Sequence, residues 1–89
     1  MEVVLFKSEE KKSIQEVAGI LRQIADKVES GEVVLSRGAE EVRLKIPANV
    51  TLELKVEEET KKYTKKSLEI EIEWPEGGEE EGSAEVSIG

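Results

Sequence analysis

Two stretches of this 89-residue chain alternate apolar and charged residues with strict period two. Residues 51–58 place three aliphatic side chains between charged neighbours, and residues 67–74 place three more before ending in Trp74. Successive side chains of a strand point to opposite faces, so each run predicts a strand with one apolar and one charged face. A fold of this chain must therefore cover one face of a sheet and leave the other in water.

A single helix is predicted between Ser13 and Gly31. Ser13 stands three residues before Glu16, which is the spacing of a capping box, and Gly31 is placed to act as a left-handed cap. Gly19 within the helix costs about 1 kcal/mol relative to Ala, which indicates either close packing on a sheet or tolerance of a small penalty. Between the caps, apolar residues recur at spacings of three and four and form one stripe. The stripe comprises Ile14, Val17, Leu21, Ile24 and Val28, with Ala18 and Ala25 beside them.

Three further runs have strand character, at residues 2–8, 32–36 and 41–46. Residues 37–40 are typical of a hairpin turn between the last two runs. The resulting element order is β-α-β-β-β-β. With short connections, this order predicts an α+β fold, namely a mostly antiparallel sheet of about five strands with one amphipathic helix across one face.

One helix cannot cover such a sheet. Five strands make a sheet about 24 Å wide, whereas a helix is about 10–12 Å across. The sheet must curl around the helix, or the C-terminal residues must cover the remainder, or a second copy must do so. We favour the second copy and expect a homodimer. The candidate interface residues are Phe6, Ile72, Trp74, Val86 and Ile88.

The composition changes after Pro75. We expect residues 1–75 to form one domain and residues 76–89, which are rich in Gly and Glu, to form an acidic tail. Residues 84–88 alternate again, so the tail either ends in a short edge strand or stays disordered.

Charge and composition limit the functions that the chain can have. The net charge of −8 makes nucleic acid or an anionic membrane an unfavourable partner. The absence of Cys and His removes the usual nucleophile, the usual general base and the commonest transition-metal ligands. We therefore expect no enzyme activity and no cofactor. The lack of Cys and of an export signal favours a cytoplasmic location.

Two charged clusters remain as candidate binding sites. Glu69, Glu71 and Glu73 form a carboxylate ladder that, with Glu53 and Glu57 on a neighbouring strand, could hold a divalent cation. The alternative is a solvated face on which cross-strand pairs with Lys55, Arg43 and Lys45 neutralise the charge. A basic cluster could engage phosphate, or it could be a solvated turn that protects an edge strand. The cluster comprises Lys61, Lys62, Tyr63, Lys65 and Lys66.

Three segments of the chain together resemble the small prokaryotic domain called amphi-Trp. They are VVLFKSEEKKSIQEVAGILRQIADKVESGEV, EEVRLKIPANVTLELKVE and SLEIEIEWPEG, the last being an amphipathic strand that ends in Trp74. The resemblance covers about residues 2–77 and leaves the acidic tail outside. It supports the α+β fold and implies no activity, cofactor or catalytic residue.

Two functions are consistent with these features. The first is a self-associating structural or interaction module with an unknown cytoplasmic protein as a further partner, in which Trp74 is either an interface anchor or a core residue. The second is a module that binds cations or a basic partner through the carboxylate ladder and the acidic tail.

Overall fold

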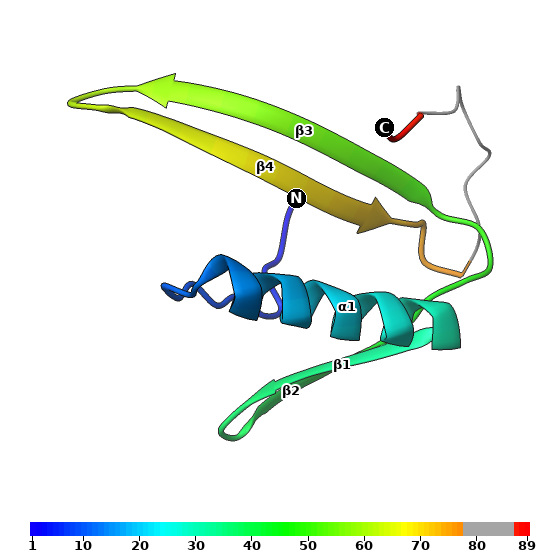
Figure 1. The fold of residues 1–89 in the computed structure, drawn as a ribbon. Coiled ribbons are helices and arrows are strands. Elements are labelled where there is room, and N and C mark those ends of the chain that lie inside the picture. The colour runs from blue at the N-terminus through cyan, green and yellow to red at the C-terminus, as the bar shows by residue number, and fades with distance from the viewer. Residues whose placement is uncertain (78–86) are drawn as a thin grey trace. The chain divides into compact units, whose positions relative to one another are not determined.

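The computed structural model describes residues 1–77 and 87–89, and these residues form one helix and four strands (Figure 1). Contacts within the chain divide it into two compact units, Met1–Ile46 and Pro47–Gly89. Each unit contains one antiparallel hairpin. The α+β class predicted from the sequence is confirmed.

Helix α1 spans Ile14–Ser30, as the periodicity predicts. At its start, the Ser13 N–H donates to Glu16 Oε1 at 3.2 Å and the Glu16 N–H donates to Ser13 Oγ at 3.1 Å, which completes the capping box. At its end, Gly31 has a φ of 87° and its N–H donates to the carbonyl oxygens of Lys27 and Val28. Among the residues that the structure describes, no helix has both the length and the apolar content needed to cross a membrane.

The first hairpin consists of strands β1 (Glu32–Arg37) and β2 (Glu40–Lys45). The two strands are joined by a two-residue turn in which Gly38 has a φ of 57°. A glycine with positive φ at the first central position is typical of a type II′ turn, whose twist matches that of the paired strands. The hairpin that residues 37–40 predicted is therefore confirmed, with strands that run slightly further into the turn.

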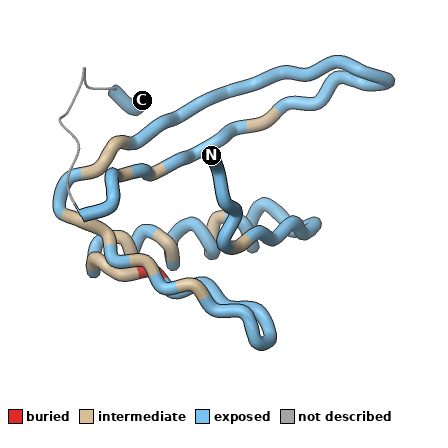
Figure 2. The backbone as a smooth tube through the Cα atoms, turned by 180° about the vertical axis from the view of Figure 1, so that it is seen from behind, coloured by how far each residue is buried: buried red, intermediate tan, exposed pale blue. Residues whose placement is uncertain are grey.

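Helix α1 packs along β1 and forms the small core of the first unit. Val33 in β1 is the one buried apolar residue in the described part of the chain, with 8% of its surface exposed. Leu44 lies opposite Val33 in β2 and is half-buried, as are Ile24 and Val28 of α1. Figure 2 shows the buried position on the first hairpin. The core therefore involves the C-terminal half of α1.

The second hairpin consists of strands β3 (Thr51–Thr60) and β4 (Thr64–Glu73), each ten residues long. A three-residue turn joins them, and the Lys61 N–H donates to the Tyr63 carbonyl oxygen at 3.1 Å. Both runs of period two therefore form strands, as predicted. The strands extend further toward the turn than the alternation alone indicated, and β4 ends at Glu73, one residue before Trp74.

The prediction of a single sheet of about five strands is wrong. The four strands form two separate two-stranded sheets, β1 with β2 and β3 with β4. Residues 2–8 do not form a strand, although their composition favours one. Val3, Val4 and Leu5 are consecutive rather than alternating apolar residues, and all three are exposed. Strand propensity requires a neighbouring strand to which the backbone can bond, and each described strand pairs only with its neighbour in sequence.

Candidate functional site

One face of the β3–β4 hairpin is apolar and open. In the register of the hairpin, Leu52 lies opposite Ile72, Leu54 opposite Ile70, and Val56 opposite Leu68. These six side chains share one face of the ribbon because each position is two residues from the next. We call this surface the apolar hairpin face. Five of its six members are exposed, from 42% for Leu54 to 78% for Val56, and Ile72 is half-buried.

The same face becomes polar toward the turn. Lys66 lies opposite Glu58 with 3.7 Å between Lys66 Nζ and Glu58 Oε1, and the hydroxyls of Thr60 and Thr64 are 3.0 Å apart. The apolar hairpin face is therefore confined to the half of the ribbon far from the turn. From Leu52 to Val56 it is about 13 Å long, since a strand rises about 3.3 Å per residue.

The opposite face of the hairpin is charged and partly paired. Lys55 Nζ lies 3.6 Å from Glu69 on β4 and 3.8 Å from Glu57 on its own strand. This is the cross-strand pairing that the sequence predicted for Lys55. Arg43, in contrast, pairs with Glu32 at 2.6 Å and with Glu41 at 3.5 Å in the other hairpin.

Lys45 also belongs to the first hairpin, where its register partner in β1 is Glu32. Arg43 and Lys45 are therefore not cross-strand neighbours of the carboxylate ladder, because β2 pairs with β1 and not with β3 or β4. The alternation predicted which residues share a face of their own strand. It did not show which strands are neighbours, and Lys55 is left as the lysine that pairs with Glu69.

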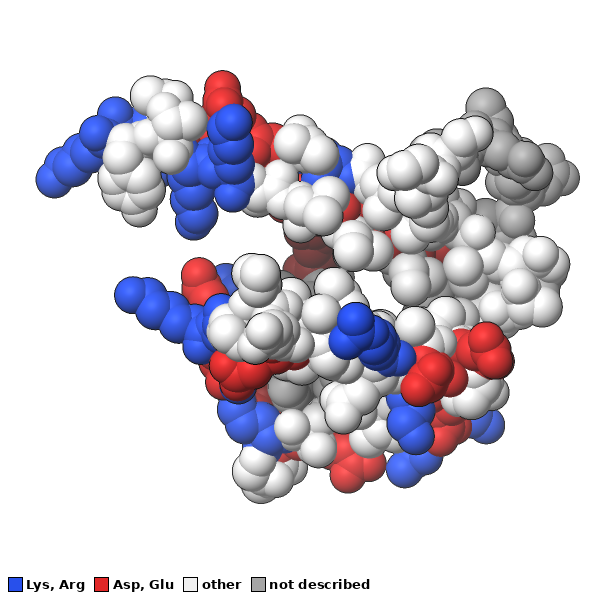
Figure 3. All heavy atoms as spheres, in the orientation of Figure 1, with Lys and Arg blue, Asp and Glu red and all other residues white. Residues whose placement is uncertain are grey.

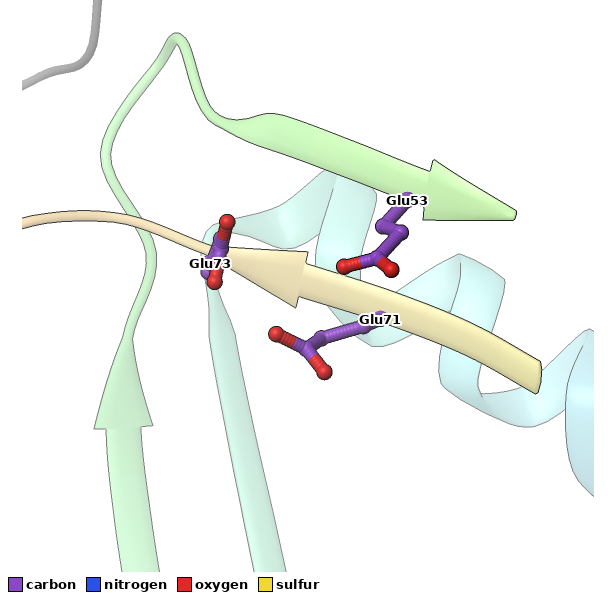
Figure 4. A group of neighbouring side chains, drawn as sticks. All are labelled: Glu53, Glu71 and Glu73. Atoms are coloured by element: carbon purple, nitrogen blue, oxygen red, sulfur yellow. The ribbon is translucent and has the colours of Figure 1, made fainter. Parts of the chain in front are cut away.

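Three glutamates gather near the end of β4. Carboxylate oxygens of Glu53, Glu71 and Glu73 lie within 4.8 Å of one another, and Glu53 is the cross-strand partner of Glu71 (Figure 4). A hydrogen bond with the Glu73 carboxyl, which needs a proton, raises the pKa of Glu71, and the nearby Glu73 charge raises it further. All three residues are exposed. The group combines the hard oxygen ligands that Ca²⁺ and Mg²⁺ prefer.

The basic cluster predicted from the sequence lies at the turn of the β3–β4 hairpin, where Figure 3 shows Lys and Arg side chains gathered. Lys61 Nζ pairs with Glu59 at 3.0 Å, and the Lys61 side chain is 82% exposed. Tyr63 is also exposed. Glutamates of the adjoining strand thus neutralise part of the basic charge, which fits a solvated turn between two open strand edges.

The predicted interface residues are distributed over both units. Ile72 belongs to the apolar hairpin face, and Trp74, half-buried, follows the end of β4. Phe6 lies in the other unit, where the Arg37 guanidinium is 5.5 Å from the centre of its ring. Ile88 is 80% exposed. Val86 and the predicted edge strand lie in residues 78–86 or depend on them, outside the described part of the chain.

A second open apolar surface lies on α1. Ile14, Val17 and Leu21 follow one another along the helix at spacings of three and four, and all three are exposed. We call this row the N-terminal stripe of α1. The sequence predicted this row as part of one continuous apolar stripe along the helix. Ile24 and Val28, further along the same stripe, are half-buried.

The fold places this protein among small α+β domains, which include many families. The comparison with known families shows to which one it belongs. The family model of the Amphi-Trp domain matches residues 1–89, so the chain belongs to the Amphi-Trp domain family. The match includes the acidic tail, which the resemblance drawn from the sequence had placed outside the family pattern. No curated protein and no solved structure matches the chain.

Proposed function

We propose that this Amphi-Trp domain is a self-associating structural or interaction module, and that the apolar hairpin face is its association surface. The observation that carries the proposal is the exposure of five aliphatic side chains on one face of an ordered ribbon. A contiguous exposed apolar patch with a polar border is a common mark of a protein interaction site. Here the border is the Glu58–Lys66 pair and the charged edge of the hairpin.

The stability of a hairpin supports the same proposal. A two-stranded ribbon is at best marginally stable alone in water, and it becomes stable when its apolar face packs against another element. The charged face of β3–β4 is stable in contact with water, because the charged groups of Lys55 and its glutamate partners are favourably hydrated. The apolar face is therefore the surface that gains from being covered. Its burial contributes about 25 cal/mol for each Å² of apolar surface removed from water.

The proposed assembly is a homodimer, and the same surface is available to an unknown protein partner. The absence of Cys is compatible with a reducing compartment, and we place the module in the cytoplasm. The net charge of −8 disfavours nucleic acid and anionic membrane surfaces as partners. The proposal involves no catalytic step and no cofactor.

Sedimentation equilibrium tests the proposal on the full chain. We expect a dimer that dissociates when Leu54→Thr or Val56→Thr replaces an apolar side chain by one that keeps a branched strand-forming shape. The matched control is Lys55→Thr, which changes the charged face between these two positions and should leave the dimer intact. A wild-type chain that stays monomeric at high micromolar concentration would refute the proposal.

A second candidate function is the binding of a divalent cation or a basic partner by Glu53, Glu71 and Glu73. The proximity of the three carboxylates favours it, since a bound cation relieves the repulsion among them. Calorimetric titration with CaCl₂ and MgCl₂ tests it, with Glu71→Gln expected to abolish the heat and Glu59→Gln expected to preserve it. Absence of heat in the wild type, together with no salt-sensitive retention on basic proteins, would remove this candidate.

A further inference from the structure

The turn of the β3–β4 hairpin carries a basic recess that the proposed association does not use. We call it the turn recess. It has a volume of about 390 Å³ and is lined by Glu59, Lys61, Lys62, Tyr63 and Lys65. Small-molecule sites commonly have volumes of about 300–1,000 Å³. All five residues belong to one hairpin, so the recess is complete within one unit of the chain.

The turn recess lies on the charged side of the ribbon. Glu59 and Lys65 lie opposite one another in the register of the hairpin, and each is an odd number of residues from the apolar positions of its strand. Their side chains therefore point away from the apolar hairpin face. A ligand in the recess and a partner on the apolar hairpin face use different side chains.

Hydrogen bonds at the turn fix the backbone around the recess. The Lys61 N–H donates to the Tyr63 carbonyl oxygen at 3.1 Å, and the hydroxyls of Thr60 and Thr64 are 3.0 Å apart. The Tyr63 ring belongs to no core, since 73% of the residue is exposed. An open aromatic ring beside ammonium groups offers a surface on which a planar group of an anionic ligand can stack.

The lysines of the turn recess are only partly paired. Lys61 Nζ lies 3.0 Å from Glu59 Oε1. Lys62 and Lys65, in contrast, make no ion pair within the part of the chain that the structure describes. Three lysines and one glutamate leave a net formal charge of +2 in the recess. The recess therefore favours an anion, although the whole chain is acidic.

The acidic groups further along the hairpin do not cancel this local charge. Glu57 and Glu69, which line the adjoining part of the same face, both pair with Lys55, at 3.8 and 3.6 Å. Glu53 is six residues from Glu59 along β3, which is about 20 Å of strand. Charges so far apart are largely screened, because the Debye length is about 8 Å at physiological ionic strength.

We propose that the turn recess binds a phosphomonoester that carries an aromatic ring, which is the chemistry of a nucleoside monophosphate. A phosphomonoester has a charge of about −1.5 to −2 at pH 7, which matches the net charge of the recess. Its oxygens accept hydrogen bonds from the ammonium groups of Lys62 and Lys65, and its ring stacks on Tyr63. The inference goes beyond the proposed function and is independent of self-association.

An NMR titration of the full chain, followed at the amide signals of the turn, tests the ligand class. We expect adenosine 5′-monophosphate to bind at least about tenfold more tightly than adenosine, which lacks the anion. It should bind at least about fivefold more tightly than inorganic phosphate, which lacks the ring, and Tyr63→Leu should remove this second difference. Equal affinities for the three compounds, or shifts confined to other parts of the chain, overturn the inference.

Charge variants test the residues. The double variant Lys62→Gln, Lys65→Gln should weaken binding of the monophosphate at least about tenfold. The matched control is Lys45→Gln, which removes the same charge from an exposed position of the other hairpin and should change the affinity less than about twofold. Glu59→Gln removes the negative charge from the recess and should tighten binding. An unchanged affinity in the double variant, or weaker binding in Glu59→Gln, contradicts the inference and leaves the proposed function standing.

Discussion

Leu54 and Ile70 lie directly opposite one another across the β3–β4 hairpin, and 42% and 50% of their surfaces are exposed. A cross-strand aliphatic pair at the centre of a ribbon ordinarily belongs to a protein core. Here the pair lies at the centre of the surface to which we assign self-association. The alternation thus produces an exposed apolar face, on which our proposal of self-association rests.

Replacement of Gly19 by alanine should stabilise helix α1. An added Cβ at this helical position meets no atom within 4 Å, so the glycine is not required by close packing and its cost is simply tolerated. We expect Gly19→Ala to stabilise the chain by up to about 1 kcal/mol, which corresponds to roughly 4–8 °C in Tm for a domain of this size. Thermal unfolding followed by circular dichroism measures the change.

The matched control is Gly31→Ala. Gly31 has a φ of 87°, which alanine adopts only with strain, so this second substitution should lower Tm. Destabilisation by Gly19→Ala would mean that the side of α1 carrying Gly19 is covered in the assembled protein.

Glu71 makes folding less favourable as it ionises. Because its pKa in the folded chain lies above the ordinary value of 4.5, the cost is absent at low pH and present in full once the pH exceeds the folded pKa. Glu71→Gln should therefore raise stability at pH 7, and its advantage over the wild type should vanish below about pH 4.5. Urea unfolding across this pH range measures the difference.

Two related variants check the cause. Glu73→Gln removes the same repulsion and should stabilise in the same pH window, whereas Lys55→Gln removes an attractive charge and should destabilise. A Glu71→Gln variant that is no more stable than the wild type at pH 7 would show that a bound cation or partner already neutralises the cluster.

The capping box of α1 has the opposite pH dependence. The hydrogen bond from the Ser13 N–H, followed by the one with the Ser13 hydroxyl, lowers the pKa of Glu16. A lowered pKa gives stability that is present above the unfolded pKa and is lost as the pH falls through the folded value. Glu16→Gln keeps a capping side chain but should lose this acid sensitivity.

Ser13→Ala removes the cap itself and should cost about 1 kcal/mol at neutral pH. Chemical denaturation at pH 7 and pH 3 separates the two variants. An unchanged stability of Ser13→Ala would indicate that residues before the helix satisfy its first N–H groups in another way.

The acidic tail should be dispensable for self-association. The apolar hairpin face, to which we assign self-association, lies within residues 1–77. A chain that ends at Gly77 should therefore sediment as the same dimer as the full chain. A monomeric truncated chain would assign the tail, which the family model includes, to the interface.

Local patterns determined most of what could be predicted about this fold. The capping box at Ser13, the glycine cap at Gly31 and the period-two runs all act through neighbours in sequence, and each was predicted correctly. These local patterns did not determine which strands share a sheet. Period two shows which side chains share a face, but strand propensity in residues 2–8 did not reveal that the described chain supplies no strand to pair with them.

The candidate site was predicted in part for the same reason. Ile72 and the glutamate ladder were identified, because alternation places them. Leu54, Val56 and the N-terminal stripe of α1 were predicted as members of apolar faces but not as exposed residues, since no sequence pattern distinguishes a buried apolar face from an open one. The exposure of these apolar residues follows from the division of the strands into two separate sheets, which the sequence did not predict.

The described strands pair as β1 with β2 and β3 with β4, across turns of two and three residues. Short loops cost little closure entropy, and folding rates rise as contacts become more local. Each hairpin can therefore form early in folding, but the β3–β4 hairpin becomes stable only when its apolar face is covered. Under the proposed function, the slow step would be the association of two chains. Its rate depends on concentration, so the amount of the protein in the cell would control how much of it is assembled.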